Sequence, residues 1–374
     1  MAISRTDQSL MGRWWWTVDR WTVLALTVLC GFGALMAMAA SPAVAQRIGA
    51  DSFHFVHHQL ALIPATMLIM FVVSLQTPRS IRRIAAITLL ISLVLLALTF
   101  VIGVDVKGAR RWIGAGALSI QPSEFVKPGF AVICGWLLAE QKNPASKIPG
   151  NWIAAGLFVV IAAMLIKQPD LGQTIVISAI IFAEAFLAGL PVILVGMGAM
   201  VGAGGIAAAY FLLPHVHARI DRFLDPSGGG GYQVARSLEA FSNGGLWGRG
   251  PGEGTVKNYL PDAHADFVFA VAGEEFGLAV CLVIVVLFCF VVLRGFARLM
   301  HEHNLYVVLA ASGLLVQFGL QAAINMASTL HLIPTKGMTL PFLSYGGSSL
   351  LALGLGMGMV LGLTRKRFGT GELT

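Results

Sequence analysis

The chain has 374 residues, of which 57% are apolar and only 11% are charged, against about 25% charged in a typical soluble domain. This composition excludes a soluble protein and predicts an all-α polytopic membrane protein, with one transmembrane domain over residues 1–374. The net charge of +7 does not indicate a nucleic-acid partner, because Lys and Arg cluster in short loops and at the termini, where they set membrane topology.

Ten apolar runs have roughly the 20 residues that a membrane-spanning helix needs. They cover residues 22–41, 58–76, 84–103, 124–140, 152–168, 173–189, 191–213, 268–293, 305–330 and 343–363. If segment 1–21 is cytoplasmic, the basic residues of the inner loops and of the tail 364–374 all fall on the cytoplasmic side, as the positive-inside rule requires. The sequence therefore predicts ten transmembrane helices, cytoplasmic N- and C-termini, and one large extracytoplasmic loop, 213–275, between helices 7 and 8.

The predicted outer loop between runs 84–103 and 124–140 is basic, against the positive-inside rule. It contains Lys107, Arg110, Arg111 and Trp112. Such a cluster predicts an anionic ligand, for example a phosphate held by Arg forks near the membrane surface. The alternative is that these side chains reach toward the interface beside the Trp without binding anything.

The segment Gln121-Pro-Ser-Glu-Phe-Val-Lys127 lies at the start of the fourth run. Pro122 suits the first turn of a helix, and Glu124 and Lys127, three residues apart, can pair on one helix face. Charges that enter a membrane are candidates for function, although a purely structural ion pair is the alternative.

Two further outer segments carry polar residues. Lys167-Gln-Pro-Asp170 predicts a short rigid turn, with an ordinary charged turn as the alternative. The glycine-rich stretches at 228–231 and 243–250 lack the Gly-Lys-Ser/Thr ending of a nucleotide-binding loop, so we interpret both as flexible loops.

Asp266 stands one residue before Phe267-Val-Phe-Ala270, where the loop becomes the eighth helix. Helix capping alone could explain a carboxylate there, but the outer cations favour a chemical role. On a helix, Glu274 lies about 12 Å further along and Glu275 faces away, so neither forms a close carboxylate pair with Asp266. The close carboxylate pair of a retaining glycosidase is therefore not expected from these residues, and Asp262 in the loop is the alternative partner.

Seven motifs, in order along nearly the whole chain, resemble those of the SEDS family, the shape, elongation, division and sporulation proteins. They are Ala109-Arg-Arg-Trp-Ile113, Gln121-Pro-Ser-Glu124, Gln168-Pro-Asp170, Gly231-Tyr-Gln233, Leu260-Pro-Asp-Ala-His264, Asp266-Phe267 and Leu340-Pro-Phe-Leu-Ser-Tyr-Gly-Gly-Ser-Ser349. The resemblance implies ten transmembrane helices and peptidoglycan glycosyltransferase activity on the lipid-linked precursor lipid II.

The resemblance also implies roles for single residues. Asp266 matches the essential aspartate of the family, the general base, although Ala265 replaces the Thr that commonly precedes it. Arg111, Glu124 and Lys127 match residues that family members need for activity. The remaining motif residues expected to bind substrate are Arg110, Gln121, Asp170, Gln233, His264, Ser344 and Tyr345.

Residues 104–109 and 334–337 look more like the division member of the family than like the elongation member. A division role implies a location in the bacterial cytoplasmic membrane at the septum, together with other divisome membrane proteins. It also implies a class B penicillin-binding protein, FtsI, as the partner for crosslinking, because this chain lacks a Ser-x-x-Lys transpeptidase domain.

The chemistry of that reaction assigns two tasks. A base must accept the proton of the attacking sugar hydroxyl, and positive charge must stabilise the leaving lipid pyrophosphate. Asp266 suits the first task, and Arg111 with Lys127 suits the second. No organic cofactor is needed, a Mg²⁺ or Mn²⁺ ion could bridge the phosphates, and direct displacement predicts inversion. The alternatives are a lipid II flippase, an elongation-type polymerase and a noncatalytic scaffold.

Overall fold

The computed structural model describes residues 9–49, 51, 53–106, 109–114, 119–212, 214–224 and 232–366, and its regular structure is almost entirely helical. Each predicted apolar run corresponds to one helix: α2 (Arg20–Ile48), α3 (His54–Ser74), α4 (Pro78–Ile102), α5 (Pro122–Gln141), α6 (Gly150–Lys167), α7 (Leu171–Leu187), α8 (Val192–Leu212), α11 (Val268–Leu299), α12 (Leu305–Thr329) and α13 (Gly347–Leu363). Six helices in the described residues are long and apolar enough to cross a membrane: α2, α3, α4, α6, α11 and α12. The chain is therefore a multi-pass membrane protein.

Helix α12 lies at the centre of the bundle. In its most apolar stretch 72% of the residues are buried, against 22% in α6. α12 packs against α5, α7, α11 and α13, while α13 also packs against α3 and α5 against α4. The apolar side chains that peripheral helices leave exposed, such as Ile87 and Leu90 on α4, form the surface that a lipid bilayer would cover.

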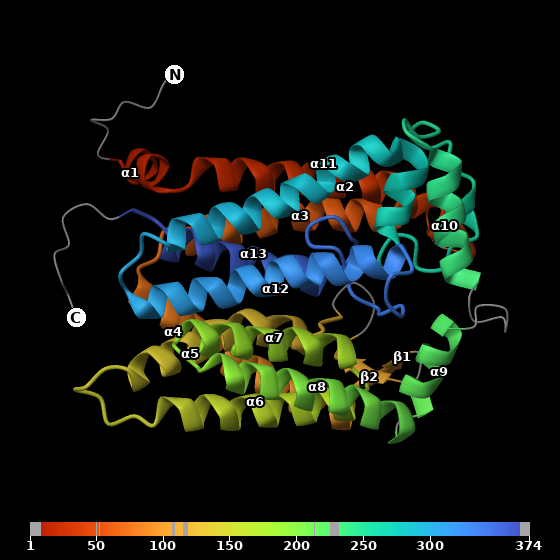
Figure 1. Cartoon of the computed structure of the whole chain (residues 1–374). Helices are drawn as coiled ribbons and strands as arrows, with labels where there is room; N and C mark the ends of the chain where they lie inside the picture. Colours follow the sequence, from red (N-terminus) through yellow and green to blue (C-terminus); the bar gives the residue numbers. More distant parts are fainter. Residues whose placement is uncertain are drawn as a thin grey trace.

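The two ends of the bundle differ (Figure 1). Helix α1 (Leu10–Thr17) and the end of α13 meet at one end, where the Lys366 amide donates to the Thr17 carbonyl at 3.1 Å. The hairpin of β1 (Val104–Val106) and β2 (Ala109–Trp112), together with α9 (Pro214–Leu224) and α10 (Tyr232–Gly244), lies at the other end. This arrangement agrees with the prediction that both termini share one side.

Segment 213–275, predicted as a loop, contains more regular structure than its polar composition suggested. Between α10 and α11 lies one turn of 3-10 helix, Val256–Asn258, and the basic loop around Arg111 is a hairpin. Lys107 and glycines 228–231 lie outside the described residues. α9 and α10 each have one apolar and one polar face, so their average hydropathy is low and hydropathy alone does not reveal them.

The interpretation of residues 243–250 as a flexible loop is wrong, because this segment supplies hydrogen-bond acceptors at a break in helix α11. Gly277 leaves helical geometry at φ 75°. The amides of Leu278 and Ala279 bond to the carbonyls of Gly245 and Leu246, at 2.9 and 3.2 Å, instead of bonding along the helix. A Cβ atom at Gly277 would lie 2.3 Å from the Gly248 nitrogen, so only glycine fits this break.

Candidate active site

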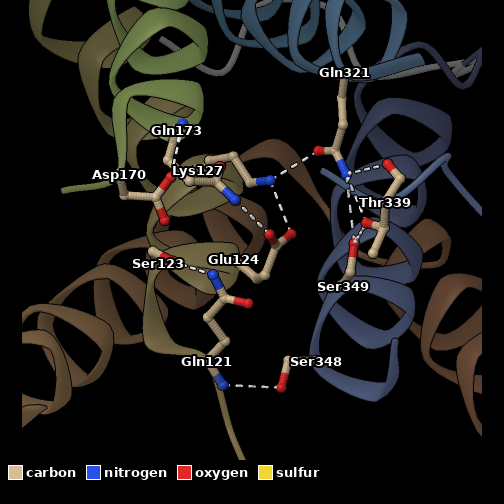
Figure 2. Close-up of polar contacts among 10 residues, drawn as sticks. All are labelled: Gln121, Ser123, Glu124, Lys127, Asp170, Gln173, Gln321, Thr339, Ser348 and Ser349. Atoms are coloured by element: carbon tan, nitrogen blue, oxygen red, sulfur yellow. Dashed lines mark hydrogen bonds and ion pairs between the residues drawn. The ribbon is translucent and has the colours of Figure 1, made fainter. Parts of the chain in front are cut away.

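A buried ion pair at the start of α5 joins three helices (Figure 2). The Lys127 ammonium donates to Glu124 Oε2 at 2.8 Å, and the side chains are 0% and 6% exposed. Lys127 also donates to Gln321 Oε1 on α12 at 2.7 Å, while Gln173 on α7 donates to Glu124 Oε1 at 2.5 Å. The predicted pair is thus confirmed, and its neutral partners satisfy hydrogen-bonding capacity that each charge would otherwise lose on burial.

The network continues from Gln321 into the segment before α13. Gln321 Nε2 donates to the carbonyl and the hydroxyl of Thr339, both at 3.2 Å. The hydroxyls of Thr339 and Ser349 bond to each other at 2.7 Å. Figure 2 shows these groups converging from α12 and α13 on the side of Lys127 that faces away from Asp170. The ion pair is therefore connected to residues 339–349 by hydrogen bonds.

Gln121 joins this network through its backbone rather than through its amide group. Its backbone N–H donates to the Ser348 hydroxyl at 3.0 Å, and its side chain donates to Ser123 at 3.1 Å. Pro122 begins α5, as predicted. Gln121 thereby fixes the start of α5 against the start of α13.

Arg111 holds the turn that begins α7. Its Nε donates to the Gln168 carbonyl at 3.1 Å and its Nη2 to the Pro169 carbonyl at 2.5 Å, while Nη1 lies 3.5 Å from Asp170 Oδ2. The Arg111 guanidinium, predicted to bind phosphate, therefore already makes hydrogen bonds within the protein, and 19% of the side chain is exposed. Arg110, next to it on β2, is exposed.

Asp170 is more than a member of a charged turn. Its carboxylate caps α7 by accepting from the Gln173 amide at 3.3 Å. Burial raises the pKa of Asp170, and the Arg111 guanidinium opposes that rise. Because Gln173 also binds Glu124, it links the Arg111–Asp170 pair to the Glu124–Lys127 pair.

Asp266 lies just before α11, beside the same segment that Gln321 reaches. Asn325, one helical turn after Gln321, donates to the backbone carbonyl of Asp266 at 2.9 Å and to that of Met338 at 2.6 Å. A Cβ atom at Gly337 would lie 3.3 Å from Asp266 Oδ2, so this glycine keeps the carboxylate flank open. The N-cap of α11 is Phe267, whose side chain makes no capping hydrogen bond. Asp266 lies one residue before this cap, where a favourable interaction with the helix dipole is the alternative to a chemical role.

His264, Ser344 and Tyr345 are brought together around the backbone of residues 264–265. The Tyr345 amide donates to the His264 carbonyl at 2.8 Å, and the Ser344 hydroxyl donates to the Ala265 carbonyl at 2.5 Å. The Tyr345 hydroxyl lies 3.2 Å from His58 Nδ1. The contact at position 265 uses the backbone, so it survives the replacement of the usual Thr by Ala.

Gln233 makes no contact with this site through the hydrogen bonds of the described residues. It lies half-buried on α10, and no hydrogen bond within the described ranges joins it to the other candidates. Its neighbours on α10 pack against α11, where a Cβ atom at Gly244 would lie 1.9 Å from the Gly273 carbonyl oxygen. The close approach of these two glycines places α10 next to the start of α11.

The sequence interpretation missed how the loop before Asp266 is held. Glu274 Oε1 accepts from the amides of Thr255 and Val256, both at 2.8 Å, and its Oε2 accepts from Lys257 at 3.1 Å. Lys257 forms an ion pair with Glu275 and donates to the Ala39 carbonyl on α2 at 3.0 Å. Both glutamate side chains thus bind the 252–258 loop, and neither pairs with Asp266.

A metal centre built from protein side chains is not found within the described ranges: no three or more His, Cys, Asp or Glu side chains gather there as ligands. The chemistry available at the site is a half-buried carboxylate at Asp266, linked through α12 to a buried ammonium at Lys127, with the guanidinium groups of Arg110 and Arg111 on the adjacent hairpin. A base and nearby cations are what glycosyl transfer from a pyrophosphate requires.

Comparison with known families and proteins places the chain among cell cycle proteins. The profile of the FtsW/RodA/SpoVE family, described as cell cycle protein, matches residues 20–368. A protein of Caulobacter vibrioides named probable peptidoglycan glycosyltransferase FtsW is 45% identical over 371 residues, covering 98% of this chain and 94% of that one. A protein of the same name from Escherichia coli is 36% identical, covering 91% of this chain and 84% of that one.

Solved structures share the fold. A chain from a peptidoglycan synthase complex, described as coordinating polymerization and crosslinking, superposes with a TM-score of 0.75 at 28% identity, covering 93% of this chain and 97% of its own. The rod shape determining protein RodA of Thermus thermophilus superposes with a TM-score of 0.68 at 26% identity, covering 95% of this chain and 99% of its own.

Proposed function

The chain belongs to the FtsW/RodA/SpoVE family, and from this membership we infer that it is a peptidoglycan glycosyltransferase of cell division. The SEDS resemblance of its motifs is thereby confirmed. The relatives named FtsW favour the division role over the elongation-type alternative.

Our proposal for the reaction is polymerisation of lipid II into glycan strands. A sugar hydroxyl attacks the anomeric carbon of the growing strand, the bond from that carbon to the lipid pyrophosphate breaks, and Asp266 accepts the hydroxyl proton. Displacement without a covalent enzyme intermediate inverts the anomeric configuration. The observation that carries this proposal is the continuous set of hydrogen bonds from Lys127 through Gln321 to residues 338–339, with Asn325 holding Met338 and Asp266 together.

In this proposal the arginines and Lys127 have different roles. Arg110 and the exposed part of Arg111 lie on the hairpin and bind the pyrophosphate, where a guanidinium supplies paired N–H donors. Lys127 is fully buried against Glu124 and Gln321, so we assign it to holding the site in shape. His264, Ser344, Tyr345, Gln121 and Asp170 remain proposed substrate contacts, as does Gln233 on α10.

A divalent cation, Mg²⁺ or Mn²⁺, is a proposed helper of the leaving group at this site. No cluster of three or more His, Cys, Asp or Glu side chains lies within the described ranges, so oxygen atoms of the substrate and of water would have to supply most of its ligands. Such an ion would supply charge neutralisation for the leaving group, while proton transfer stays with Asp266.

We further propose ten transmembrane helices with both termini in the cytoplasm, so that Asp266 faces the outside of the bacterial cytoplasmic membrane at the septum. The basic inner loops support this orientation. A class B penicillin-binding protein, FtsI, is the proposed partner, with other divisome membrane proteins beside it. The structural likeness to a chain of a peptidoglycan synthase complex supports a partner that crosslinks the strands.

Polymerisation by the purified chain tests the assignment. Wild-type protein incubated with lipid II, with its transpeptidase partner present in a parallel arm, should give glycan strands that are resolved on a gel. Asp266→Asn should give none in either arm, whereas Asp262→Asn, a change four residues earlier in the same turn, should retain activity. Equal activity of wild type and Asp266→Asn would refute the role of Asp266, and movement of lipid II across vesicles without strand formation would favour a flippase.

A further inference from the structure

A second charged feature lies at the end of the bundle opposite Asp266. It is a cavity of about 1610 Å³ between the start of α4, the ends of α5, α11 and α13, and the start of α12. Arg294 and Arg298 line it from the last turns of α11, whereas Asp266 precedes the first turn of that 32-residue helix. At about 1.5 Å per residue the two sites are some 40 Å apart, so this cavity is separate from the candidate active site.

The lining of this cavity is strongly cationic. Six basic side chains face two acidic ones, Glu140 and Glu302; the basic residues are Arg79, Arg82, Arg294, Arg298, Arg365 and Lys366. Asp19 pairs with Arg294 through two hydrogen bonds of 2.7 and 2.8 Å and lies 3.4 Å from Arg298. Burial works against ionisation of Asp19, yet these arginines keep its pKa lowered. Even with Asp19 charged, the cations exceed the nearby carboxylates.

Arg82 and Arg365 are held by partners that carry no charge. The Arg82 guanidinium lies 4.9 Å from the centre of the Trp136 ring. Arg365 Nη1 donates to the Ser74 carbonyl at 3.5 Å. The partners orient the guanidinium groups without neutralising them, which prepares the cavity for an anion.

Membrane orientation alone does not require this arrangement. The positive-inside rule is satisfied by basic residues in solvent, as at Arg83, which is exposed and does not line the cavity. Arg82, the preceding residue, is half-buried and fixed on Trp136 within it. Apolar side chains, including Leu305, Val307 and Leu363, complete the lining. Cations beside apolar surface suit a ligand with a phosphate and an acyl or glycerol portion.

We propose that this cavity binds a phosphate-bearing anion: a phosphate monoester or diester, presented by an anionic lipid headgroup or by a soluble compound. Its volume exceeds that of typical small-molecule pockets of about 300–1,000 Å³, so a headgroup with part of its lipid fits. The site lies on the face that our proposed topology assigns to the cytoplasm, and anion binding there does not depend on the glycosyltransferase assignment.

Direct binding to the full-length protein in neutral detergent tests the proposal. Native mass spectrometry and calorimetry would measure the binding of short-chain phosphatidylglycerol to the protein. Phosphatidylcholine is the zwitterionic control, and inorganic phosphate is the soluble probe. Arg82→Gln should weaken phosphatidylglycerol binding roughly 10-fold, as expected for one charge-assisted contact, whereas Arg83→Gln should change it less than about 2-fold. Trp136→Leu should also weaken binding, because it frees Arg82 without changing the charge.

The competition between the two probes distinguishes a lipid headgroup from a soluble phosphate compound. Binding of phosphatidylglycerol that inorganic phosphate does not displace identifies a lipid headgroup, and displacement at comparable concentrations identifies a soluble phosphate. Equal losses in Arg82→Gln and Arg83→Gln, or no binding of either probe by wild type, would overturn the proposal. If Arg82→Gln unfolds, the Trp136→Leu and Arg298→Gln variants decide by the same comparison with Arg83→Gln. Lipid II polymerisation is not the readout, so failure here leaves the catalytic proposal intact.

Discussion

The Glu124–Lys127 pair allows a quantitative test of what a buried charge contributes to this fold. In Lys127→Met, Glu124 keeps only the hydrogen bond from Gln173, and in Glu124→Gln, Lys127 keeps neutral amide acceptors but no opposite charge. Neither side chain is more than 6% exposed, so solvent cannot replace the missing partner. Removing one partner of a buried pair typically costs about 3–5 kcal/mol, and we expect each single variant to lose that much unfolding free energy.

The double variant Glu124→Gln with Lys127→Met should lose much less than the sum of the two single losses. It leaves three neutral amide side chains and one apolar side chain, and no stranded charge. We expect a coupling free energy of at least about 2 kcal/mol, measured by a double-mutant cycle from denaturant unfolding in detergent micelles. The pair Arg236→Gln and Glu239→Gln, an exposed i,i+3 ion pair on α10, is the matched control and should couple by about 0.5 kcal/mol or less.

Additive losses at positions 124 and 127 would refute the pairing argument. The reversed variant, Glu124→Lys with Lys127→Glu, adds a further distinction. It places each charge beside the wrong amide partner but preserves the ion pair, so it should fold better than either single variant. If it folds and does not polymerise lipid II, the network contributes to the site as well as to the fold.

Four other predictions follow from described contacts. Asp266→Asn should be expressed and inserted but should lose about 10²–10⁴-fold in polymerisation rate, measured with lipid II; normal rates would remove the base assignment. Arg111→Gln should destabilise the protein less as pH falls. The pKa of Asp170 is raised, so this buried carboxyl takes up a proton on acidification and no longer needs the positive charge of Arg111 beside it. A loss of thermal stability that does not change with pH would contradict this. Gly277→Ala should cost at least about 1–3 kcal/mol of unfolding free energy through left-handed strain alone, whereas Gly156→Ala, where a Cβ meets nothing within 4 Å, should be nearly neutral; equal effects would refute the fit at the break. Cys introduced at Trp247 should react with an impermeant thiol reagent in intact spheroplasts while Cys at Gln141 is protected, and the reverse pattern would invert the topology.

The helices and the ion pair were accessible from sequence because their signals are local. Apolar runs mark the helices, and a spacing of three places Glu124 and Lys127 on one face. The partners Gln173 and Gln321 were not predicted, because a single sequence does not state which helices meet. One signal was available: Gln317, Gln321 and Asn325 recur every four residues in the apolar run of α12, which predicts a polar stripe on one helix face.

The loop before Asp266 could not have been predicted in the same way. Its order depends on backbone bonds between residues 245–250 and α11, and on Glu274 accepting from three successive amides. Both features require a helix that stops bonding to itself at Gly277, and the glycine-rich composition of the loop suggested mobility instead. Likewise, the contacts of Arg111 with the carbonyls of residues 168–169 depend on the fold bringing the hairpin to α7.

The break at Gly277 divides α11 into two parts with different mechanical attachments. The first part, residues 268–276, follows directly on Asp266 and is hydrogen-bonded to the 245–260 segment; Lys257 and Arg47 tie that segment to α2 through the carbonyls of Ala39 and residue 260. The second part, residues 278–299, packs on α12. A displacement of α10 or of the 245–260 segment would therefore reach Asp266 without first bending residues 278–299.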